Sequence, residues 1–269
     1  MNAPITKDID LAVSLLRKGE LVSFPTETVY GLGADAQNPS AIQQVFRVKG
    51  RPADHPLIVH IASSDQLAVW AKDIPANAWL LAEHFWPGPL TMILRKQPSV
   101  SMLITGNQDT IAIRIPKHSL TLELLKRFGS GLVGPSANKY GQVSPTTAAH
   151  VAADLGTSVA AILDGGVCDV GIESTIINLC NDDPIIMRQG AITAAEISAV
   201  LGLDNDIKIN TQTTNVIRVS GSHESHYAPN TKAYFLSKDQ LDIKIAAYLQ
   251  HQQKFSVLSF SARPNELPN

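Results

Sequence analysis

Polar residues that could bind a small anion stand at several points of the 269-residue chain where an apolar run ends. The first group is FPTETVYGLG, residues 24–33, in which hydroxyls, a carboxylate and a phenol follow a predicted strand. Ligands of open α/β sheets bind beyond the strand ends, and Gly31 and Gly33 would permit close approach of the backbone to a ligand. The alternative is a polar loop whose threonine side chains cap its own backbone.

The second group is cationic. Lys49 and Arg51 flank Gly50 at the predicted end of a helix, and His55 follows closely. A turn that holds two cations suits phosphate oxygens, although the helix dipole alone also favours cations at this position. His60 ends the apolar run LIVH, where a histidine is more often a packed core or edge residue than a ligand.

The third group offers neutral hydrogen-bond donors. Ser136 and Asn138 lie in GPSAN, after a predicted strand, and residues 144–146 (SPT) are predicted to open a helix. Helix N–H groups and hydroxyls such as that of Ser144 can bind an anion without any formal charge. The same letters also form an ordinary helix N-cap with proline in the first turn.

The fourth group contains two arginines at predicted strand ends. Arg114 closes TIAIRIP, Arg188 closes PIIMR, and Ser174 lies in GIEST at the start of another strand. The arginine fork matches a carboxylate or a phosphate bidentately, and an unpaired arginine is costly to bury. Pairing with Glu173 or with an aspartate is the structural alternative.

Several familiar sites are missing from the sequence. It contains no G-x-x-x-x-G-K-[ST], no G-x-G-x-x-G, no G-x-S-x-G and no metal-ligand spacing, which excludes P-loop, dinucleotide-binding and nucleophile-elbow sites. The two cysteines, Cys168 and Cys180, are predicted to be reduced core thiols. Any ATP would therefore need a site of a different kind.

Composition indicates a soluble, unexported globular protein. The chain is 44% hydrophobic and 17% charged, with a net charge of −2, and it has neither an N-terminal signal nor an apolar run of about 18 residues. Residues 1–150 hold 14 Lys and Arg against 11 Asp and Glu, whereas residues 151–215 hold 2 against 9. This asymmetry suits a small phosphorylated ligand better than a nucleic acid, which usually needs a strongly basic domain.

These groups must be positioned by an α/β framework. Apolar periodicity and capping residues predict helices at 9–16, 39–50, 64–72, 76–85, 120–128, 146–155 and 193–202, with strands between them. This alternation indicates an α/β layer fold, and the consecutive strands STIINL and PIIMR suggest that part of the sheet is antiparallel. Residues 203–215 are predicted to be a linker, and residues 231–260 a strand–helix–strand unit too small to be stable alone.

The motifs FPTETVYGLG, KGRPADHPLIVHI, FWPGPLT, IAIRIP, GPSAN…SPT, GIESTI and IMRQG occur in this order over roughly residues 10–205. Together they resemble the YrdC/Sua5 family of threonylcarbamoyl-adenylate synthases. Residues 220–229, SGSHESHYAP, resemble the linker motif of the longer Sua5 type, although His223-Glu224 replaces its more usual residues. The part after residue 230 is shorter than the full C-terminal α/β domain of that type.

The resemblance implies an α/β fold of the YrdC type, a twisted mixed parallel and antiparallel sheet with helices on both faces and a deep central cavity. It implies a catalytic domain at 1–202, a linker and lid at 203–230, and a partial C-terminal unit at 231–269. The implied reaction joins L-threonine, bicarbonate or CO2 and ATP into threonylcarbamoyl-adenylate, with release of pyrophosphate. Its product serves the t6A37 modification of tRNAs that read ANN codons.

The resemblance also assigns roles to residues, none of them a covalent nucleophile or a metal ligand. Those expected around threonine are Thr28, His60, Arg114 and Ser174. Those expected around ATP are Lys49, Arg51, His55, Ser136, Asn138, Ser144, Arg188 and Tyr227, with Tyr227 closing over the nucleotide. Mg²⁺ carried by ATP is the expected cofactor, with no tightly bound organic cofactor.

The expected setting is the cytoplasm, without a membrane, where the product passes to the tRNA threonylcarbamoyl-transferase machinery and no stable nucleic-acid binding is required. One alternative is an RNA-binding or ribosome-maturation protein that uses the same cavity. Another is a carbamoyltransferase like the related domain of hydrogenase-maturation proteins. The acylphosphatase segment and zinc-finger cysteines that usually accompany that domain are absent here.

Overall fold

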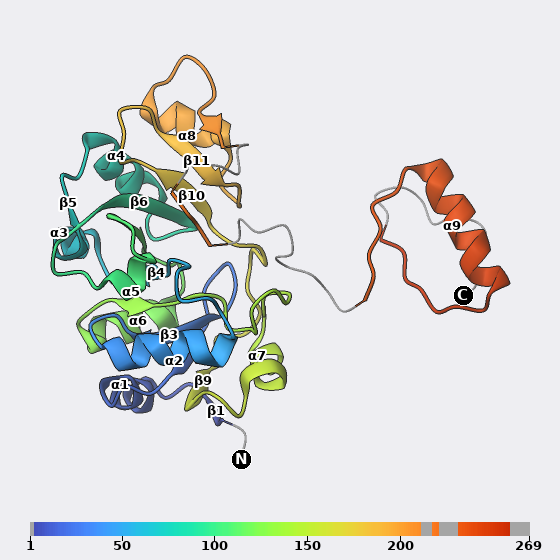
Figure 1. The fold of residues 1–269 in the computed structure, drawn as a ribbon, viewed down its shortest axis with the longest axis horizontal. Coiled ribbons are helices and arrows are strands. Elements are labelled where there is room, and N and C mark those ends of the chain that lie inside the picture. Colours follow the sequence, from blue (N-terminus) through green and yellow to red (C-terminus); the bar gives the residue numbers. More distant parts are fainter. Residues whose placement is uncertain (1–2, 211–216, 221–230, 259–269) are drawn as a thin grey trace. The chain divides into compact units, whose positions relative to one another are not determined.

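A computed structural model describes residues 3–210, 217–220 and 231–258 of the chain. The chain divides into two compact units, residues 1–228 and 229–269. The first unit contains the sheet, and the second contains a single helix among its described residues (Figure 1). Within the described ranges, no helix is both long and apolar enough to cross a membrane.

Twelve strands among the described residues form one mixed sheet. In chain order they are β1 (Ile5–Thr6), β2 (Val22–Phe24), β3 (Gly31–Asp35), β4 (Ile58–His60), β5 (Ala71–Lys72), β6 (Leu90–Lys96), β7 (Thr110–Arg114), β8 (Leu132–Val133), β9 (Ala161–Leu163), β10 (Thr175–Asn178), β11 (Ile185–Arg188) and β12 (Lys208–Ile209). Their spatial order is β1-β9-β2-β3-β8-β4-β7-β6-β10-β11-β12, with β5 added beside β6. Strands β4 and β7 are parallel, whereas β10 and β11 are antiparallel, as STIINL and PIIMR predicted.

Helices alternate with these strands and confirm the predicted α/β class. They are α1 (Ile9–Arg17), α2 (Pro39–Lys49), α3 (Leu67–Trp70), α4 (Ala76–Phe85), α5 (Met102–Thr105), α6 (Ser119–Phe128), α7 (Ala148–Leu155), α8 (Ala194–Leu201) and α9 (Lys238–Gln250), with a 3-10 turn η1 (Ser64–Gln66). Sequence signals locate α2 closely. The Asn38 side chain accepts hydrogen bonds from the N–H groups of Ser40 and Ala41, Pro39 opens the helix, and Gly50 ends it with φ of 62°.

The two faces of the sheet are covered differently. On one face, α2, α4, α7 and α8 pack over a large apolar cluster that includes Tyr30, Leu32 and Val59. On the other face, α1 and α6 cover a cluster around Phe24 and Leu132. Farther along that second face, a separate patch of Ile58, Ile93, Ile176 and Met187 is covered by Ile217 and Val219 of an irregular segment.

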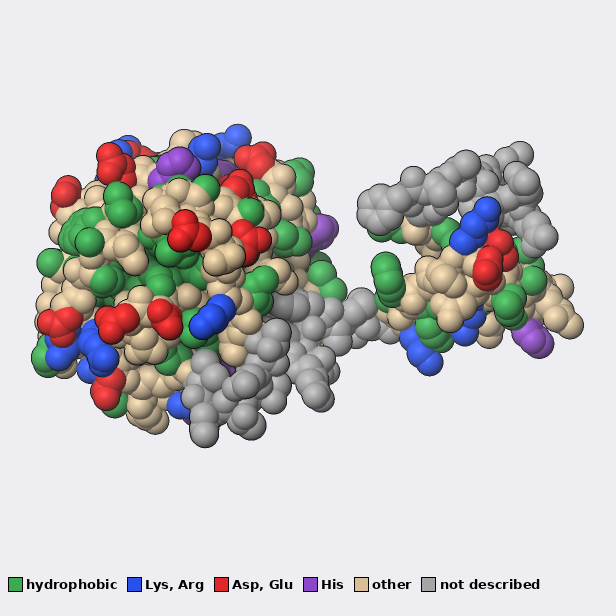
Figure 2. All heavy atoms as spheres, turned by 90° about the horizontal axis from the view of Figure 1, so that it is seen from above, with side chains coloured by type: hydrophobic (Ala, Val, Ile, Leu, Met, Phe, Trp, Pro, Cys, Tyr) green, Lys and Arg blue, Asp and Glu red, His purple; other side chains and the backbone are tan. Residues whose placement is uncertain are grey.

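Among the described residues of the first unit, no helix contributes to this patch of the second face. Because side chains alternate along a strand, the residues that end β4 and β7 point to this same face. Figure 2, which looks down on Figure 1 from above, shows another side of the molecule, where hydrophobic side chains are interspersed with acidic and basic ones.

The structure corrects several predicted elements of the first unit. Gly31 and Gly33 belong to β3 instead of a loop, and the predicted helix at 64–72 consists of η1, α3 and β5. Residues 208–209, predicted as linker, form β12 beside β11, and Ile207 is buried. A polar stretch can join a sheet edge because the hydrogen bonds of a strand come from its backbone.

The second unit differs from the predicted strand–helix–strand pattern. Its helix α9 begins with a capping box between Ser237 and Gln240, but residues 231–236 and 251–258 contain no strand. Among the described residues of this unit only Ile245 is buried, and Phe235 is fully exposed. A strand forms when a neighbouring edge supplies hydrogen bonds, and these residues have no such neighbour in the described part.

Candidate functional site

The predicted ligand residues begin at the ends of two adjacent strands. His60 ends β4, Arg114 ends β7, and the two are register partners across the parallel pair. Both are buried on the second sheet face, with 3% and 4% exposure. The edge of the Phe24 ring lies against His60, with ring centroids 5.5 Å apart.

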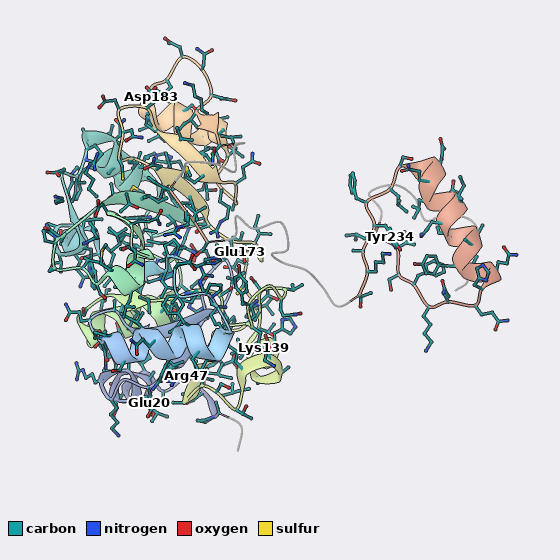
Figure 3. The ribbon with its side chains drawn as sticks, in the orientation of Figure 1. Glu20, Arg47, Lys139, Glu173, Asp183 and Tyr234 are labelled. Carbon is teal, nitrogen blue, oxygen red and sulfur yellow. The ribbon has the colours of Figure 1, made fainter. Side chains whose placement is uncertain are left out.

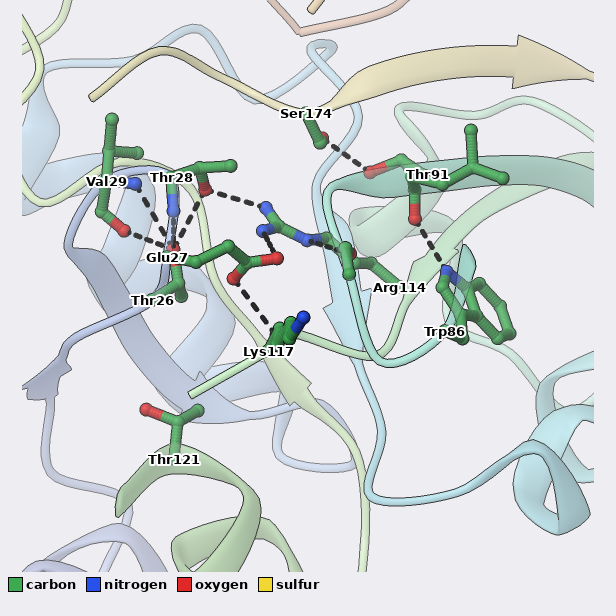
Figure 4. Close-up of polar contacts among 12 residues, drawn as sticks. Thr26, Glu27, Thr28, Val29, Trp86, Thr91, Arg114, Lys117, Thr121 and Ser174 are labelled. Carbon is green, nitrogen blue, oxygen red and sulfur yellow. Dashed lines mark hydrogen bonds and ion pairs between the residues drawn. The ribbon is translucent and has the colours of Figure 1, made fainter. Parts of the chain in front are cut away.

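Arg114 is at the centre of a buried polar network (Figure 4). Its Nε donates to the carbonyl of Gly88 at 3.2 Å, and its Nη1 donates to Oγ1 of Thr28 at 2.9 Å. Its Nη2 lies 2.8 Å from Oε1 of Glu27 in an ion pair whose two side chains are each 5% exposed. The structural alternative of an ion pair is therefore realised, but with Glu27 instead of Glu173 or an aspartate.

Glu27 and Thr28 are held by a turn that is bonded on several sides. Oγ1 of Thr26 donates to the carbonyl of Val29 at 2.6 Å and lies 2.8 Å from Oγ1 of Thr28. The carbonyls of Glu27 and Thr28 accept from the N–H groups of Val170 and Gly171 at 2.8 and 3.1 Å. The first group is thus partly a loop whose threonines cap its own backbone, which was the alternative interpretation. Two of its side chains, those of Glu27 and Thr28, also contact Arg114.

His60 is uncharged at neutral pH. Burial, and then the nearby positive charge of Arg114, lower the pKa of His60 to about 3. Its Nδ1 is buried without a hydrogen-bond partner and lies against Gly134, where a Cβ atom would come within 2.8 Å of it.

Ser174 lies in the loop before β10 and contacts residues of two strands, β6 and β11. Its Oγ lies 2.7 Å from Oγ1 of Thr91 on β6, and Nη2 of Arg188 donates to its carbonyl at 3.0 Å. Nη1 of Arg188 donates to the carbonyl of Ser220 at 2.8 Å. Arg188 thus bridges the loop before β10 and the segment 217–220.

Arg51 reaches the same segment from the opposite direction. Its Nη2 donates to Oγ of Ser220 and to the carbonyl of Pro56, both at 3.0 Å. Its guanidinium carbon lies 5.9 Å from the centre of the Tyr140 ring, and His55 meets that ring edge-on with centroids 5.5 Å apart. Arg51 and Arg188 are therefore brought together at Ser220.

Lys49 holds the GPSAN turn in this structure. Its Nζ donates to the carbonyls of Ser136 and Asn138 at 2.5 and 2.6 Å. Burial, and then the charge of Arg51, lower the pKa of Lys49 to about 7. Lys49 was expected to face phosphate directly, whereas here it fixes the loop that carries Ser136 and Asn138.

Ser144 pairs with an acidic residue. Its Oγ donates to Oε1 of Glu173 at 2.5 Å, and Glu173, labelled in Figure 3, belongs to the loop ahead of β10. The predicted helix start at 144–146 is wrong, because α7 begins at Ala148 and its N-cap is Thr147. The hydroxyl that caps this helix is that of Thr147, which accepts a hydrogen bond from the N–H of His150.

Contacts join the described site residues into groups. Thr28, Arg114 and His60 belong to one group, and Ser174, Arg188, Ser220 and Arg51 belong to another. Tyr227 lies outside the described residues. A pocket lined by Ile58, Ile93, Ala112 and the segment 217–220 shares Ser220 with the second group, while the deep central cavity stays a prediction.

Several residues that contact the predicted ligand residues were not predicted from the sequence. Glu27 lies in the PTETVYG motif, and its position as a single carboxylate between two threonines could have marked it as a site residue. Ser220 stood in the linker motif. No sequence signal pointed to Thr91 or Tyr140, because their roles depend on contacts with residues distant in the sequence. Oγ1 of Thr91 lies 2.7 Å from Oγ of Ser174, and the ring centroids of Tyr140 and His55 are 5.5 Å apart.

Two family models match this chain. The model described as "Telomere recombination", of the Sua5, YciO and YrdC proteins, matches residues 14–190. The model described as "Threonylcarbamoyl-AMP synthase, C-terminal domain" matches residues 192–268.

Curated relatives share this chain's sequence over most of its length. The threonylcarbamoyl-AMP synthase of Pyrococcus abyssi is 40% identical over 260 residues, which cover 93% of this chain and 76% of the relative. The enzyme of the same name from Bacillus subtilis is 42% identical over 252 residues, covering 92% and 72%. The crystal structure of P. abyssi Sua5 complexed with L-threonine has a TM-score of 0.86 and 38% identity, covering 97% of this chain and 82% of that one. From the ordered motifs, the mixed sheet and these matches, the chain belongs to the Sua5/YrdC family.

Proposed function

We infer that this chain synthesises threonylcarbamoyl-AMP from L-threonine, bicarbonate or CO2 and ATP, releasing pyrophosphate. It is a nucleotidyltransferase of tRNA modification. The observation that carries the assignment is the buried Arg114 network, in which a guanidinium suited to a carboxylate lies beside the hydroxyl of Thr28. Two further arginines, Arg51 and Arg188, meet at Ser220.

The reaction needs alignment more than covalent help from the protein. The amine of threonine captures CO2 as a carbamate, and a carbamate oxygen then attacks the α-phosphorus of ATP. Two anions that repel each other must be held together while charge grows on the departing pyrophosphate. A site with fixed cations and neutral donors meets both needs.

The threonine end of the proposed site consists of Thr28, His60, Arg114 and Ser174. Arg114 binds the carboxylate of threonine through its N–H groups, which suit a planar anion. A neutral His60 adds no second cation next to Arg114, and its Nε2 can accept a hydrogen bond from the amine or the hydroxyl of the substrate. An uncharged acceptor suits an amine that must react without a proton.

The ATP end of the proposed site consists of Lys49, Arg51, His55, Ser136, Asn138, Ser144, Arg188 and Tyr227. Arg51 and Arg188 would turn their N–H groups from Ser220 to the phosphates, which accept stronger charge-assisted bonds. Mg²⁺ would be held mainly by the phosphates, because the described residues contain no group of three or more His, Cys, Asp or Glu placed around a metal. Bound there, the ion would neutralise phosphate charge.

We further propose the domain roles and the cellular setting. Residues 1–202 form the catalytic domain, and residues 231–269 form a Sua5-type C-terminal part. Residues 203–230 link the two and carry the lid motif, and they also supply β12 and the side chains of Ile217 and Val219 to the first unit. The protein acts in the cytoplasm and passes its unstable product to the tRNA threonylcarbamoyl-transferase machinery. The basic side chains of the face in Figure 2 form no continuous stripe, which disfavours an RNA groove on that face.

The test is incubation of the full chain with ATP, bicarbonate, Mg²⁺ and labelled L-threonine. We expect threonine-dependent pyrophosphate release and a labelled adenylate. Omission of threonine or of bicarbonate is the control for each substrate. Salt-sensitive RNA binding without threonine-dependent pyrophosphate would overturn the assignment in favour of an RNA-binding protein.

A further inference from the structure

We propose that Glu27 is a positioning residue for threonine recognition, because its carboxylate fixes the Arg114 guanidinium and turns unused N–H groups of that guanidinium toward the carboxylate of the substrate. The proposal rests on the function inferred above and names a residue through which its specificity would work. Glu27 would act through Arg114 and would not touch the reacting atoms.

The contacts of Arg114 are distributed over all three nitrogens of its guanidinium. An arginine has five N–H groups on three nitrogens. Nε is used by the carbonyl of Gly88, and Nη1 by Oγ1 of Thr28. Nη2 lies 2.8 Å from Oε1 of Glu27 in the buried ion pair. These three contacts engage three of the five N–H groups, and we assign the remaining two to the carboxylate of the substrate.

Glu27 is held in place by contacts that do not involve the guanidinium of Arg114. Its Oε2 accepts a hydrogen bond from the backbone N–H of Lys117 at 3.0 Å. Its carbonyl accepts from the N–H of Val170 at 2.8 Å. The carboxylate is thus anchored to the segment after β7 (Figure 4), and the backbone of Glu27 is anchored to the segment before β10. Together they give Arg114 a fixed partner.

The pairing of Glu27 with Arg114 also has an electrostatic role. Both partners are almost fully buried, and a buried cation without a counter-ion is strongly disfavoured. Glu27 keeps Arg114 paired before substrate arrives, so that the guanidinium need not turn to another acceptor. Threonine then binds to an ordered guanidinium and loses less affinity to ordering it.

Three variants of the full chain test the proposal. Glu27→Ala removes both carboxylate contacts, whereas Glu27→Gln keeps the size and one acceptor oxygen. Thr121→Val is the matched control, because Oγ1 of Thr121 donates to the carbonyl of Pro25 under the same turn but makes no contact with Arg114. Thermal unfolding of each variant reports whether it folds.

The measurements are calorimetric binding of L-threonine and of L-threoninol, which lacks the carboxylate, and steady-state KM and kcat for pyrophosphate release. We expect Glu27→Ala to raise the Kd and KM for threonine about tenfold or more, with KM for ATP unchanged and kcat at saturating threonine within about threefold. The ratio of threoninol Kd to threonine Kd should be smaller for Glu27→Ala than for wild type. Glu27→Gln lies between wild type and Glu27→Ala, and Thr121→Val keeps the wild-type preference.

An unchanged or lower threonine Kd in folded Glu27→Gln, or equal losses for threonine and threoninol, would overturn the proposal. If Glu27→Ala does not fold, the Gln variant decides alone. Wild-type protein that binds threonine but releases no pyrophosphate would overturn the proposed reaction and leave the role of Glu27 standing. Binding is therefore measured separately from turnover.

Discussion

Charged side chains of the candidate site are bound to protein groups before any substrate is present. Arg114 pairs with Glu27, Lys49 donates to two carbonyls, and Arg51 and Arg188 both donate to Ser220. Because burying an unpaired charge is costly, each cation in a dry site needs such partners. In the proposed function Arg51 and Arg188 would exchange Ser220 for phosphate, whereas Arg114 would keep Glu27, and we expect single substitutions of these residues to change stability as well as affinity.

Arg114 illustrates this double effect. We expect Arg114→Ala to lower threonine-dependent pyrophosphate release by about two orders of magnitude or more, and to lower the free energy of unfolding by about 3–5 kcal/mol because Glu27 stays buried without its partner. Glu27→Gln combined with Arg114→Met should recover most of the stability and none of the activity. Urea denaturation and the pyrophosphate assay measure the two effects.

Full activity of the folded Arg114→Ala variant at low threonine would show that Arg114 is not the carboxylate ligand. Equal stability of the single and the double variants would show instead that the ion pair contributes nothing to the fold.

His60 gives a pH dependence of stability. Its pKa falls from 6.5 in the unfolded chain to about 3 in the folded one, so between these values the unfolded chain binds a proton that the folded chain does not. The free energy of unfolding should therefore fall as the pH drops through this window. From pH 7 to pH 5 we expect wild type to lose about 1–2 kcal/mol more than His60→Gln does.

Equilibrium denaturation at several pH values measures this difference. His84→Gln, a substitution of an exposed histidine, is the control. Parallel pH profiles for wild type and His60→Gln would contradict a neutral buried His60.

At the scale of elements, strand ends bring the site together, and glycines in β3 let β2 and β3 pack. A Cβ atom on Gly31 would lie 2.8 Å from the Phe24 ring, and one on Gly33 would lie 2.7 Å from the carbonyl of Val22. The two glycines thus serve packing within the sheet, whereas the sequence suggested close approach to a ligand. A side chain can yield to a new methyl group, but a backbone carbonyl in a ladder cannot.

This difference predicts unequal rescue. Gly31→Ala and Gly33→Ala should each destabilise the fold by about 1–3 kcal/mol through overpacking. In double-mutant cycles Phe24→Leu should recover most of the Gly31→Ala cost and less of the Gly33→Ala cost. Equal recovery at the two positions, measured by urea denaturation, would contradict the contacts.

At the scale of the whole molecule, the second sheet face is completed by a segment distant in sequence from the strands it covers. Ile217 and Val219 pack over Ile58, Ile93 and Ile176. The side chain of Arg218 adds an ion pair to Asp54 at 3.1 Å and a bond to the carbonyl of Gly106 at 2.5 Å. The segment that follows the sheet is thus part of the fold of the first unit.

Truncation should show this contribution. The free energy of unfolding should be lower by about 2 kcal/mol or more for a chain cut after residue 210 than for a chain cut after residue 228. The reason is that each buried aliphatic side chain contributes about 1.5–3 kcal/mol. Val219→Ser in the longer form is the matched control and should account for part of the loss. Equal stability of the two truncated forms would mean that the segment does not cover the patch.

The sequence by itself determined the alternating elements, the strand-end positions of His60, Arg114 and Arg188, and the family, because these follow from local periodicity, capping and ordered motifs. Several features were decided only by the tertiary structure: the pairing of Arg114 with Glu27 across 87 positions, the hold of Lys49 on the GPSAN turn, the strand at Lys208–Ile209, and the start of α7 at Ala148. The physical reason is that a buried charge takes whichever partner the folded chain brings within reach. A strand likewise forms wherever a sheet edge can supply backbone hydrogen bonds. Neither the partner of a buried charge nor the position of a sheet edge can be predicted from the neighbouring residues in the sequence.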